Sequence, residues 1–168
     1  EMKFIKQELL TSGYYDFHLH FVYLKQLFST FWGYGQSVAG NQDGMSFQFG
    51  LVHWAIILTS IISYFFIKNT NIKSYPLFWL FFIVYAVFFM HEISVSFWEN
   101  LKPLSFVQYP WRFLMIIAIS SSSLLALLLT KLQSKLHQSI GIFVLILLIF
   151  IFYSSFLKPS VFIPNNFF

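Results

Sequence analysis

Long apolar runs, separated by short polar connections, fill the chain from about residue 49 to residue 157. A helix needs about 20 apolar residues to cross the roughly 30 Å of hydrocarbon in a bilayer. In the second of these runs, the uninterrupted apolar part covers only Leu77 to Met90, and the ionisable His91 and Glu92 follow it. The pattern predicts an all-α, polytopic membrane protein with about four transmembrane helices. The predicted spans are about Phe49 to Ile67, Pro76 to Ile93, Trp111 to Thr130 and Ser139 to Leu157.

The chain before these runs is aromatic and rich in glycine. Tyr14 to Phe31 is amphipathic, and its periodicity fits either a helix lying on the membrane or a pair of strands. The next stretch, WGYGQSVAGNQDGMSFQFG, alternates glycines with aromatic residues and contains the turn signal Asp43-Gly44. Because long loops in compact proteins are commonly functional, we expect an ordered loop that contributes to a site.

Positive charge predicts the orientation of the spans. Lys68 and Lys73 lie between spans one and two, and Lys131 and Lys135 lie between spans three and four. Short loops rich in lysine stay in the cytoplasm. We therefore expect residues 1–48 to form an extracytoplasmic loop segment, and residues 49–157 to form the transmembrane region, with an outer insert at 94–110. Residues 158–168 would form an extracytoplasmic tail, so the two long segments share one side of the membrane.

Composition supports the membrane class and excludes others. Hydrophobic residues make up 58% of the chain and charged residues 10%, against about 25% charged residues in soluble domains. The chain has no cysteine, which excludes disulfides and thiolate metal sites. The net charge of +4 is scattered, so we expect the lipid bilayer and no nucleic acid as a partner. Met2 to Leu10 is too charged for the apolar region of a signal peptide, and we expect the chain to be a piece of a longer protein.

The polar and aromatic stretch Trp98 to Arg112, between the apolar runs of spans two and three, ends at the only arginine of the chain. Pro110 disfavours helix at Tyr109 and suits the first turn of a helix that starts at Trp111. Arg112 would then lie at the water boundary with free donors, and a guanidinium binds phosphate through two parallel hydrogen bonds. The alternative is an arginine that only reaches from a span end towards the headgroups.

Asp16, His18 and His20 alternate along the chain and would share one face of a strand. Two histidines and a carboxylate could hold a divalent metal with open coordination positions, which is the one cofactor that the sequence suggests. The alternative is a hydrogen-bonded role at the membrane interface. Asp43 in the glycine-rich loop is a candidate base or cation ligand, or else a turn residue.

Two further polar features lie in or beside the predicted spans. His91 and Glu92 are an ionisable pair at membrane depth if span two includes them, and an ordinary solvated pair if it ends at Met90. Ser120 to Ser123 places four hydroxyls in span three. Small polar residues at this depth favour close helix packing, and a polar pathway is the alternative.

The motifs WGYGQS, DGMSFQFG and QYPWRFL, in this order, support a family resemblance that covers about Tyr14 to Leu129. The chain resembles the later part of prokaryotic membrane proteins labelled 6-pyruvoyl-tetrahydropterin-synthase-related, which are similar to GT-C glycosyltransferases that use lipid-linked sugars. The label does not imply pterin chemistry, because no histidine-bound zinc motif of a pterin synthase is present. The resemblance implies that the catalytic base lies in an earlier outer loop. It also implies a lipid-phosphate surface made of Arg112, Trp111, Gln108, Trp32, Asp43 and Gln48.

From these observations we expect a fragment of a multi-pass membrane protein of a bacterial or archaeal cell membrane. The resemblance implies that it transfers a sugar from a polyprenyl-phosphate carrier at the outer face. The alternatives are a transporter or flippase component, whose outer loops gate a pathway, and a non-catalytic membrane scaffold.

Overall fold

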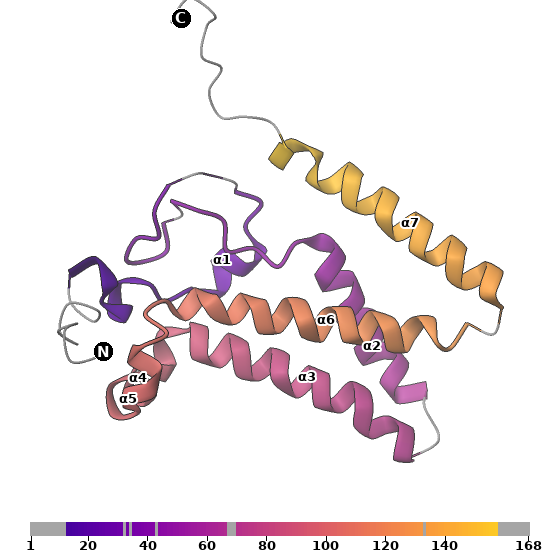
Figure 1. The fold of residues 1–168 in the computed structure, drawn as a ribbon, viewed down its shortest axis with the longest axis horizontal. Helices are drawn as coiled ribbons and strands as arrows, with labels where there is room; N and C mark the ends of the chain where they lie inside the picture. Colours follow the sequence, from indigo (N-terminus) through magenta and orange to yellow (C-terminus); the bar gives the residue numbers. More distant parts are fainter. Residues whose placement is uncertain are drawn as a thin grey trace, which may run out of the picture.

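The structure is a computed structural model that describes residues 13–31, 33, 35–42, 44–66, 70–132 and 134–157 (Figure 1). These residues form helices and connecting loops, with no β-sheet among them, which confirms the predicted all-α class. The α-helices are α1 Leu24–Phe28, α2 Leu51–Phe66, α3 Thr70–Met90, α4 Val95–Asn100, α5 Lys102–Ser105, α6 Leu114–Leu129 and α7 Lys135–Tyr153. The 3₁₀ helices are η3 Gly13–Tyr15, η4 Phe17–Leu19, η5 Glu92–Ser94, η6 Pro110–Phe113 and η7 Ser154–Leu157.

Two or three helices of the described residues are long and apolar enough to span a membrane. Pro110–Leu129, which joins η6 to α6, has 20 residues, and α7 has 19. Ser74–Met90 and Glu92–Asn100 would make a third span only as one broken segment, because they are bent by 82°. The predicted first span, α2, has only 16 residues and extends over about 24 Å. The structure therefore supports a membrane location with fewer full-length spans than the sequence predicts.

Helix α3 differs from the predicted second span at both ends. It begins at Thr70, and Pro76 lies inside it. Proline removes one helical hydrogen bond, but its fixed φ is helical, and water near a helix end can satisfy the carbonyl that loses its partner. At the other end α3 stops at Met90, and His91 caps η5 by accepting the backbone N–H of Ile93. His91 and Glu92 therefore lie beyond the helix.

The core lies between α3 and α6, which run side by side in opposite directions (Figure 1). Ser120 and Ser121 of α6 are fully buried, and the hydroxyls of Ser121 and Ser122 donate to the carbonyl of Ala118 on their own helix. Small side chains at this depth let helices approach closely. The buried apolar residues follow helical spacing: Ile83, Ala86, Phe89 and Met90 on α3, Phe113 at the end of η6, and Ile117 and Leu124 on α6.

Helix α2 packs on α6 and α3, whereas α7 has no buried residue. Cavities of about 390 Å³ and 350 Å³ separate α7 from α2 and α6, and both are lined by Val52, Ile56, Leu125 and Leu145. We name the two ends of the bundle by their cations. The Arg112 end carries the end of α3 and the start of α6, and the Lys131 end carries the ends of α2 and α6 and the start of α3 (Figure 1).

The amino-terminal segment packs against the Arg112 end. Tyr14 to Phe31 forms neither the long amphipathic helix nor the strand pair that its periodicity fits, but η3, η4 and the short α1. Phe17 and Phe21 are buried against Trp98, so local periodicity does not decide the backbone conformation of the segment. The Val22 N–H donates to the Met90 carbonyl at 2.8 Å. Farther on, the Gly35 N–H donates to the Gly44 carbonyl at 2.7 Å, where a Cβ on Gly35 would lie 2.5 Å from that oxygen.

Trp98 of α4 joins the amino-terminal segment to α3. It is 1% exposed, and its Nε1–H donates to the Phe89 carbonyl at 3.1 Å. The Phe17 ring stacks on the indole with centroids 5.4 Å apart, and Phe21 contacts it edge-on at 6.1 Å. One side chain thus holds the docked segment, α4 and the end of α3 together.

We expect Trp98→Ala to lower the free energy of unfolding by about 3–5 kcal/mol, because it opens a cavity among buried rings. Trp98→Phe keeps most of the ring but loses the N–H donor, and we expect a smaller loss of about 1–3 kcal/mol. The check is the thermal unfolding midpoint of the purified protein in detergent. Phe106→Ala, at a ring that is 52% exposed, is the matched control and should change the midpoint little. Equal effects of Trp98→Ala and Phe106→Ala would contradict the role of Trp98.

Candidate functional site

An ion-pair cluster links the amino-terminal segment to α4. Asp16 caps η4 by accepting the His18 N–H at 3.0 Å, and the same carboxylate oxygen lies 2.6 Å from His18 Nδ1. His18 Nε2 lies 3.4 Å from Glu99 Oε1. Each ring nitrogen of His18 therefore faces a carboxylate. Asp16 is 2 residues away from His18 in the chain, and Glu99 is 81 residues away.

The carboxylates favour the charged form of His18. Partial burial opposes that charge, but the hydrogen bonds and charges of Asp16 and Glu99 outweigh it, and the pKa of His18 is raised above its ordinary value of 6.5. All three side chains are exposed to solvent in part, so the contribution of the cluster to stability is small. The effect of the ion-pair cluster is to orient the amino-terminal segment.

The three predicted metal ligands do not converge on one point. Asp16 and His18 are paired with each other, whereas His20 is 1% exposed and bonds through Nδ1 to the Ser37 hydroxyl. In the described part of the chain, no group of three or more His, Asp or Glu side chains is placed to hold a metal ion. The alternation along the sequence would bring these side chains together on a strand, but the segment forms 3₁₀ turns.

Tyr109 is the centre of an aromatic cluster beside Arg112. Its ring stacks on Trp111 with centroids 5.3 Å apart, contacts His20 edge-on at 4.8 Å and lies 6.4 Å from Tyr15. The Arg112 guanidinium carbon is 4.8 Å from the centroid of the same ring. Tyr109 thus connects the insert to the amino-terminal segment.

Arg112 is exposed and lies in the first turn of η6, as the sequence predicts. Its Nη1 donates to the Val107 carbonyl at 2.8 Å. A guanidinium has five N–H donors, and the structure gives it no further hydrogen bond among the described residues. The aromatic contact and the backbone hydrogen bond fix the group while leaving donors for an anion.

The other predicted site residues have different surroundings. Gln108 adopts a φ of 64°, a strained conformation for a residue with a side chain. Trp111 is partly buried, and its Nε1–H has no partner among the described residues. Gln48 lies apart from Arg112, in a cavity of about 100 Å³ beside Thr30 and Tyr153. Trp32 and Asp43 lie outside the described residues.

Glu92 takes part in a second contact between the insert and the amino-terminal segment. The Tyr23 hydroxyl donates to Glu92 Oε2 at 2.8 Å, and the Tyr23 ring meets the His91 ring edge-on at 5.8 Å. The hydrogen bond to Glu92, together with partial burial and the negative charge, raises the pKa of Tyr23 above its ordinary value of 10.0. Tyr23 therefore stays a neutral donor at physiological pH.

Arg112 and the aromatic rings beside it can bind an anion, and this arrangement does not by itself suggest acid–base catalysis. Arg112 offers a fixed cation with free donors, and Tyr15, Tyr109 and Trp111 offer ring surfaces beside it. The carboxylates of Asp16 and Glu99 both face His18, so they leave the charge of Arg112 unpaired among the described residues. Glu99 and Tyr109 carry this geometry; Tyr109 belongs to the motif QYPWRFL, whereas no local sequence motif marks Glu99.

We expect the His18 ring to titrate with a pKa above 6.5, and Glu99→Gln or Asp16→Asn to lower that value. A raised folded pKa means that the ion pairs stabilise the docked segment fully below the unfolded pKa of about 6.5, and that this contribution is lost as the pH rises through the folded pKa. Imidazole NMR signals of the detergent-solubilised protein measure the titration. Glu92→Gln is the control, since Glu92 bonds Tyr23 instead. If neither Glu99→Gln nor Asp16→Asn changed the pKa of His18, the result would show that the cluster does not form.

Comparison of the chain with protein-family models, with curated proteins and with solved structures found no match. The site is therefore interpreted from its own geometry and from the chemistry of its residues.

Proposed function

We propose that this chain is part of a multi-pass, GT-C-like membrane glycosyltransferase that uses a lipid-linked sugar, and that Arg112 binds the phosphate of the lipid carrier. The observation that carries the proposal is the joined surface at the Arg112 end. Two segments far apart in the sequence meet there through Tyr23 and Glu92, His18 and Glu99, and His20 and Tyr109. A polar and aromatic surface of this kind on an apolar bundle suits a ligand with a charged head and a lipid tail.

The chemistry assigned to Arg112 is electrostatic. When the sugar transfers, negative charge grows on the departing lipid phosphate, and a fixed guanidinium stabilises that charge more than it stabilises the ground state. The stacking on Tyr109 and the hydrogen bond to Val107 hold the group in place before the ligand arrives. The family resemblance assigns the base that activates the acceptor to an outer loop that precedes this region.

The spaces around α7 favour a lipid ligand. The two apolar cavities between α7, α2 and α6 have about 390 Å³ and 350 Å³. The Gln48 cavity shares Leu51, Phe152 and Tyr153 with them, and the buried Gln48 Nε2 has no partner among the described residues. An isoprenoid chain in the apolar cavities, with polar groups near Gln48, would fill this space.

The proposal includes four membrane crossings, with the Arg112 end outside the cell. Helices α2, α3, α6 and α7 alternate in direction (Figure 1), and the short connections at the Lys131 end carry lysines, as cytoplasmic loops do. Helix α2 is short for a span, and a locally thinned bilayer would accommodate it.

Because the chain has no cysteine, single cysteines report the orientation directly. We expect Phe106→Cys to react in intact cells with a maleimide that cannot cross the membrane. Leu132→Cys, at the opposite end and also exposed, should react only after permeabilisation. The reverse labelling pattern would overturn the orientation, and labelling of both residues in intact cells would overturn the predicted crossings.

Binding of a polyprenyl phosphate to the purified protein tests the role of Arg112. Loss of a charge-assisted hydrogen-bonded contact costs about 1.5–3 kcal/mol, so we expect Arg112→Ala to weaken binding by about 10- to 100-fold and Arg112→Lys to restore part of it. Lys102→Ala removes another exposed cation of the insert and is the matched control. If Arg112→Ala bound the polyprenyl phosphate as tightly as the unmodified protein does, the proposed transferase function would lose its basis. Lipid flux across vesicles without any sugar acceptor would indicate transport.

A further inference from the structure

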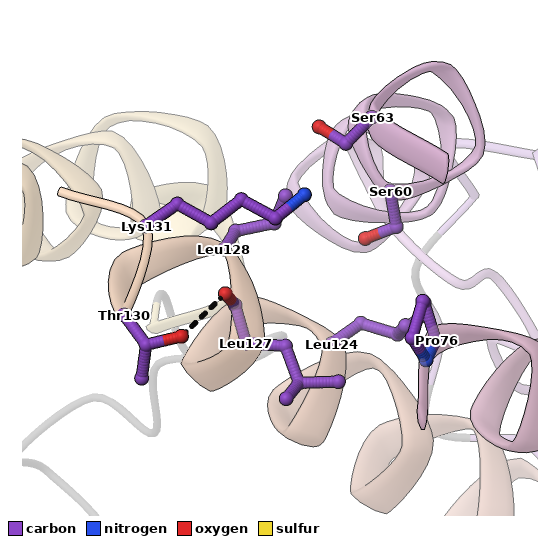
Figure 2. Close-up of a pocket in the computed structure, with 8 residues that line it drawn as sticks. All are labelled: Ser60, Ser63, Pro76, Leu124, Leu127, Leu128, Thr130 and Lys131. Carbon is purple, nitrogen blue, oxygen red and sulfur yellow. Dashed lines mark hydrogen bonds between the residues drawn. The ribbon is translucent and has the colours of Figure 1, made fainter. Parts of the chain in front are cut away.

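The Lys131 end of the bundle contains a small pocket that is independent of the proposed Arg112 site and whose lining includes three hydroxyl groups and one lysine. It lies between α2, the first turns of α3 and the end of α6, and it has a volume of about 80 Å³. Ser60 and Ser63 of α2, Pro76 of α3, and Thr130 and Lys131 after α6 contribute to its lining. Figure 2 shows the Lys131 side chain extending across the pocket towards the side that carries the two serines.

We propose that this pocket binds the phosphate group of an anionic phospholipid, with Lys131 supplying the charge and Ser60 a hydrogen bond. The ligand is defined by its chemistry, which is a tetrahedral phosphate attached to acyl chains. Four observations support it, and none of them involves Arg112.

The first observation is the absence of a counter-charge. The sequence has no Asp or Glu between Gly44 and His91 or between Asn100 and Phe168, so no acidic residue belongs to any segment at the Lys131 end. Lys131 makes no ion pair among the described residues. The described acids, Asp16, Glu92 and Glu99, lie at the Arg112 end. An anion that neutralises Lys131 must come from outside these segments, and membrane phosphates are the nearest source.

The second observation is the hydroxyl of Ser60. Its side chain is 2% exposed, and its Oγ has no hydrogen-bond partner among the described residues. A serine or threonine inside a helix commonly donates to the carbonyl four residues earlier, and the neighbouring Thr59 does so with Ala55 at 2.7 Å. Since buried polar groups are normally paired, the free hydroxyl of Ser60 indicates a ligand in the pocket that it lines.

The third observation is the hydrogen bonding of the other hydroxyl groups. Thr130 donates its Oγ1–H to the Leu127 carbonyl at 2.8 Å, as the dashed line in Figure 2 shows. That oxygen therefore cannot donate to an anion. The donors offered to a phosphate are the Lys131 ammonium and the serine hydroxyls, a charge-assisted set of the kind that phosphate oxygens accept. Donors without a nearby carboxylate favour an anion over a cation.

The fourth observation is the size and depth of the pocket. A cavity of about 80 Å³ has room for one phosphate group. Ser60 lies about 9 Å from the end of α2 at Phe66, from the helical rise per residue, which is near the headgroup region of a bilayer. Phe65 and Phe66 on the last turn of α2 are 74% and 80% exposed. These rings would contact acyl chains, which favours a lipid over a soluble phosphate.

Native mass spectrometry of the protein, released from a mild detergent with added phosphatidylglycerol, tests the proposal. We expect the unmodified protein to retain phosphatidylglycerol in preference to zwitterionic phosphatidylcholine. Lys131→Gln should weaken retention by about tenfold and Ser60→Ala by about threefold. Two matched controls should each stay within about twofold of the unmodified protein. Lys135→Gln removes a lysine that does not line the pocket, and Thr59→Ala removes a hydroxyl that is already bonded within its helix.

Three outcomes would overturn the proposal. Equal losses for Lys131→Gln and Lys135→Gln would show general attraction between lysines and an anionic surface. Retention unaffected by Ser60→Ala would remove the hydroxyl from the site. Displacement of phosphatidylglycerol by inorganic phosphate at an equal concentration would identify a soluble anion as the ligand. Size-exclusion chromatography of each variant verifies that it remains folded.

Discussion

The last carbonyls of α3 determine how the rest of the Arg112 end is built. A helix leaves its final carbonyls without intrahelical partners, and at the edge of a bilayer such groups are costly to leave unpaired. Here the Phe89 carbonyl accepts the Trp98 indole N–H, the Met90 carbonyl accepts the Val22 N–H, and the His91 carbonyl accepts both donors of Ser94. Two segments, the amino-terminal segment and the stretch that directly follows α3, therefore meet at one helix end because that end needs their donors.

This convergence explains why the polar chemistry of the described residues gathers at one end. Once Val22 is fixed to α3, the residues before and after it lie beside the insert, and His18 and Tyr23 reach Glu99 and Glu92. The acids are then occupied by these contacts, and Arg112 keeps its charge. At the opposite end the chain supplies lysine without any acid. Arg112 thus lies beside an aromatic surface at one end, and Lys131 lies at the other end in the lining of a small cavity that also contains hydroxyl groups.

The general architecture is readable from the apolar runs, because helices in lipid satisfy their own backbone and need only a sufficient length of apolar residues. The positions at which the helices begin and end are less predictable. The start of α3 at Thr70 could not be read from an apolar run that begins at Pro76, since a proline near a helix end costs only one hydrogen bond and does not exclude helix before it. The conformation of Tyr14 to Phe31 was also open, because packing on Trp98 and not local periodicity decides it.

For the site, the sequence by itself determined the helical class, the position of Arg112 at the start of a helix after Pro110, and the separation of acids from lysines along the chain. These properties are local, since they depend on residue type and on neighbours within a few positions. Only the tertiary structure decided that His18 pairs with Glu99, that His20 turns away towards Ser37, and that Gln48 lies apart from Arg112. Such pairings join residues far apart in the chain, and they depend on which segments supply donors to the end of α3.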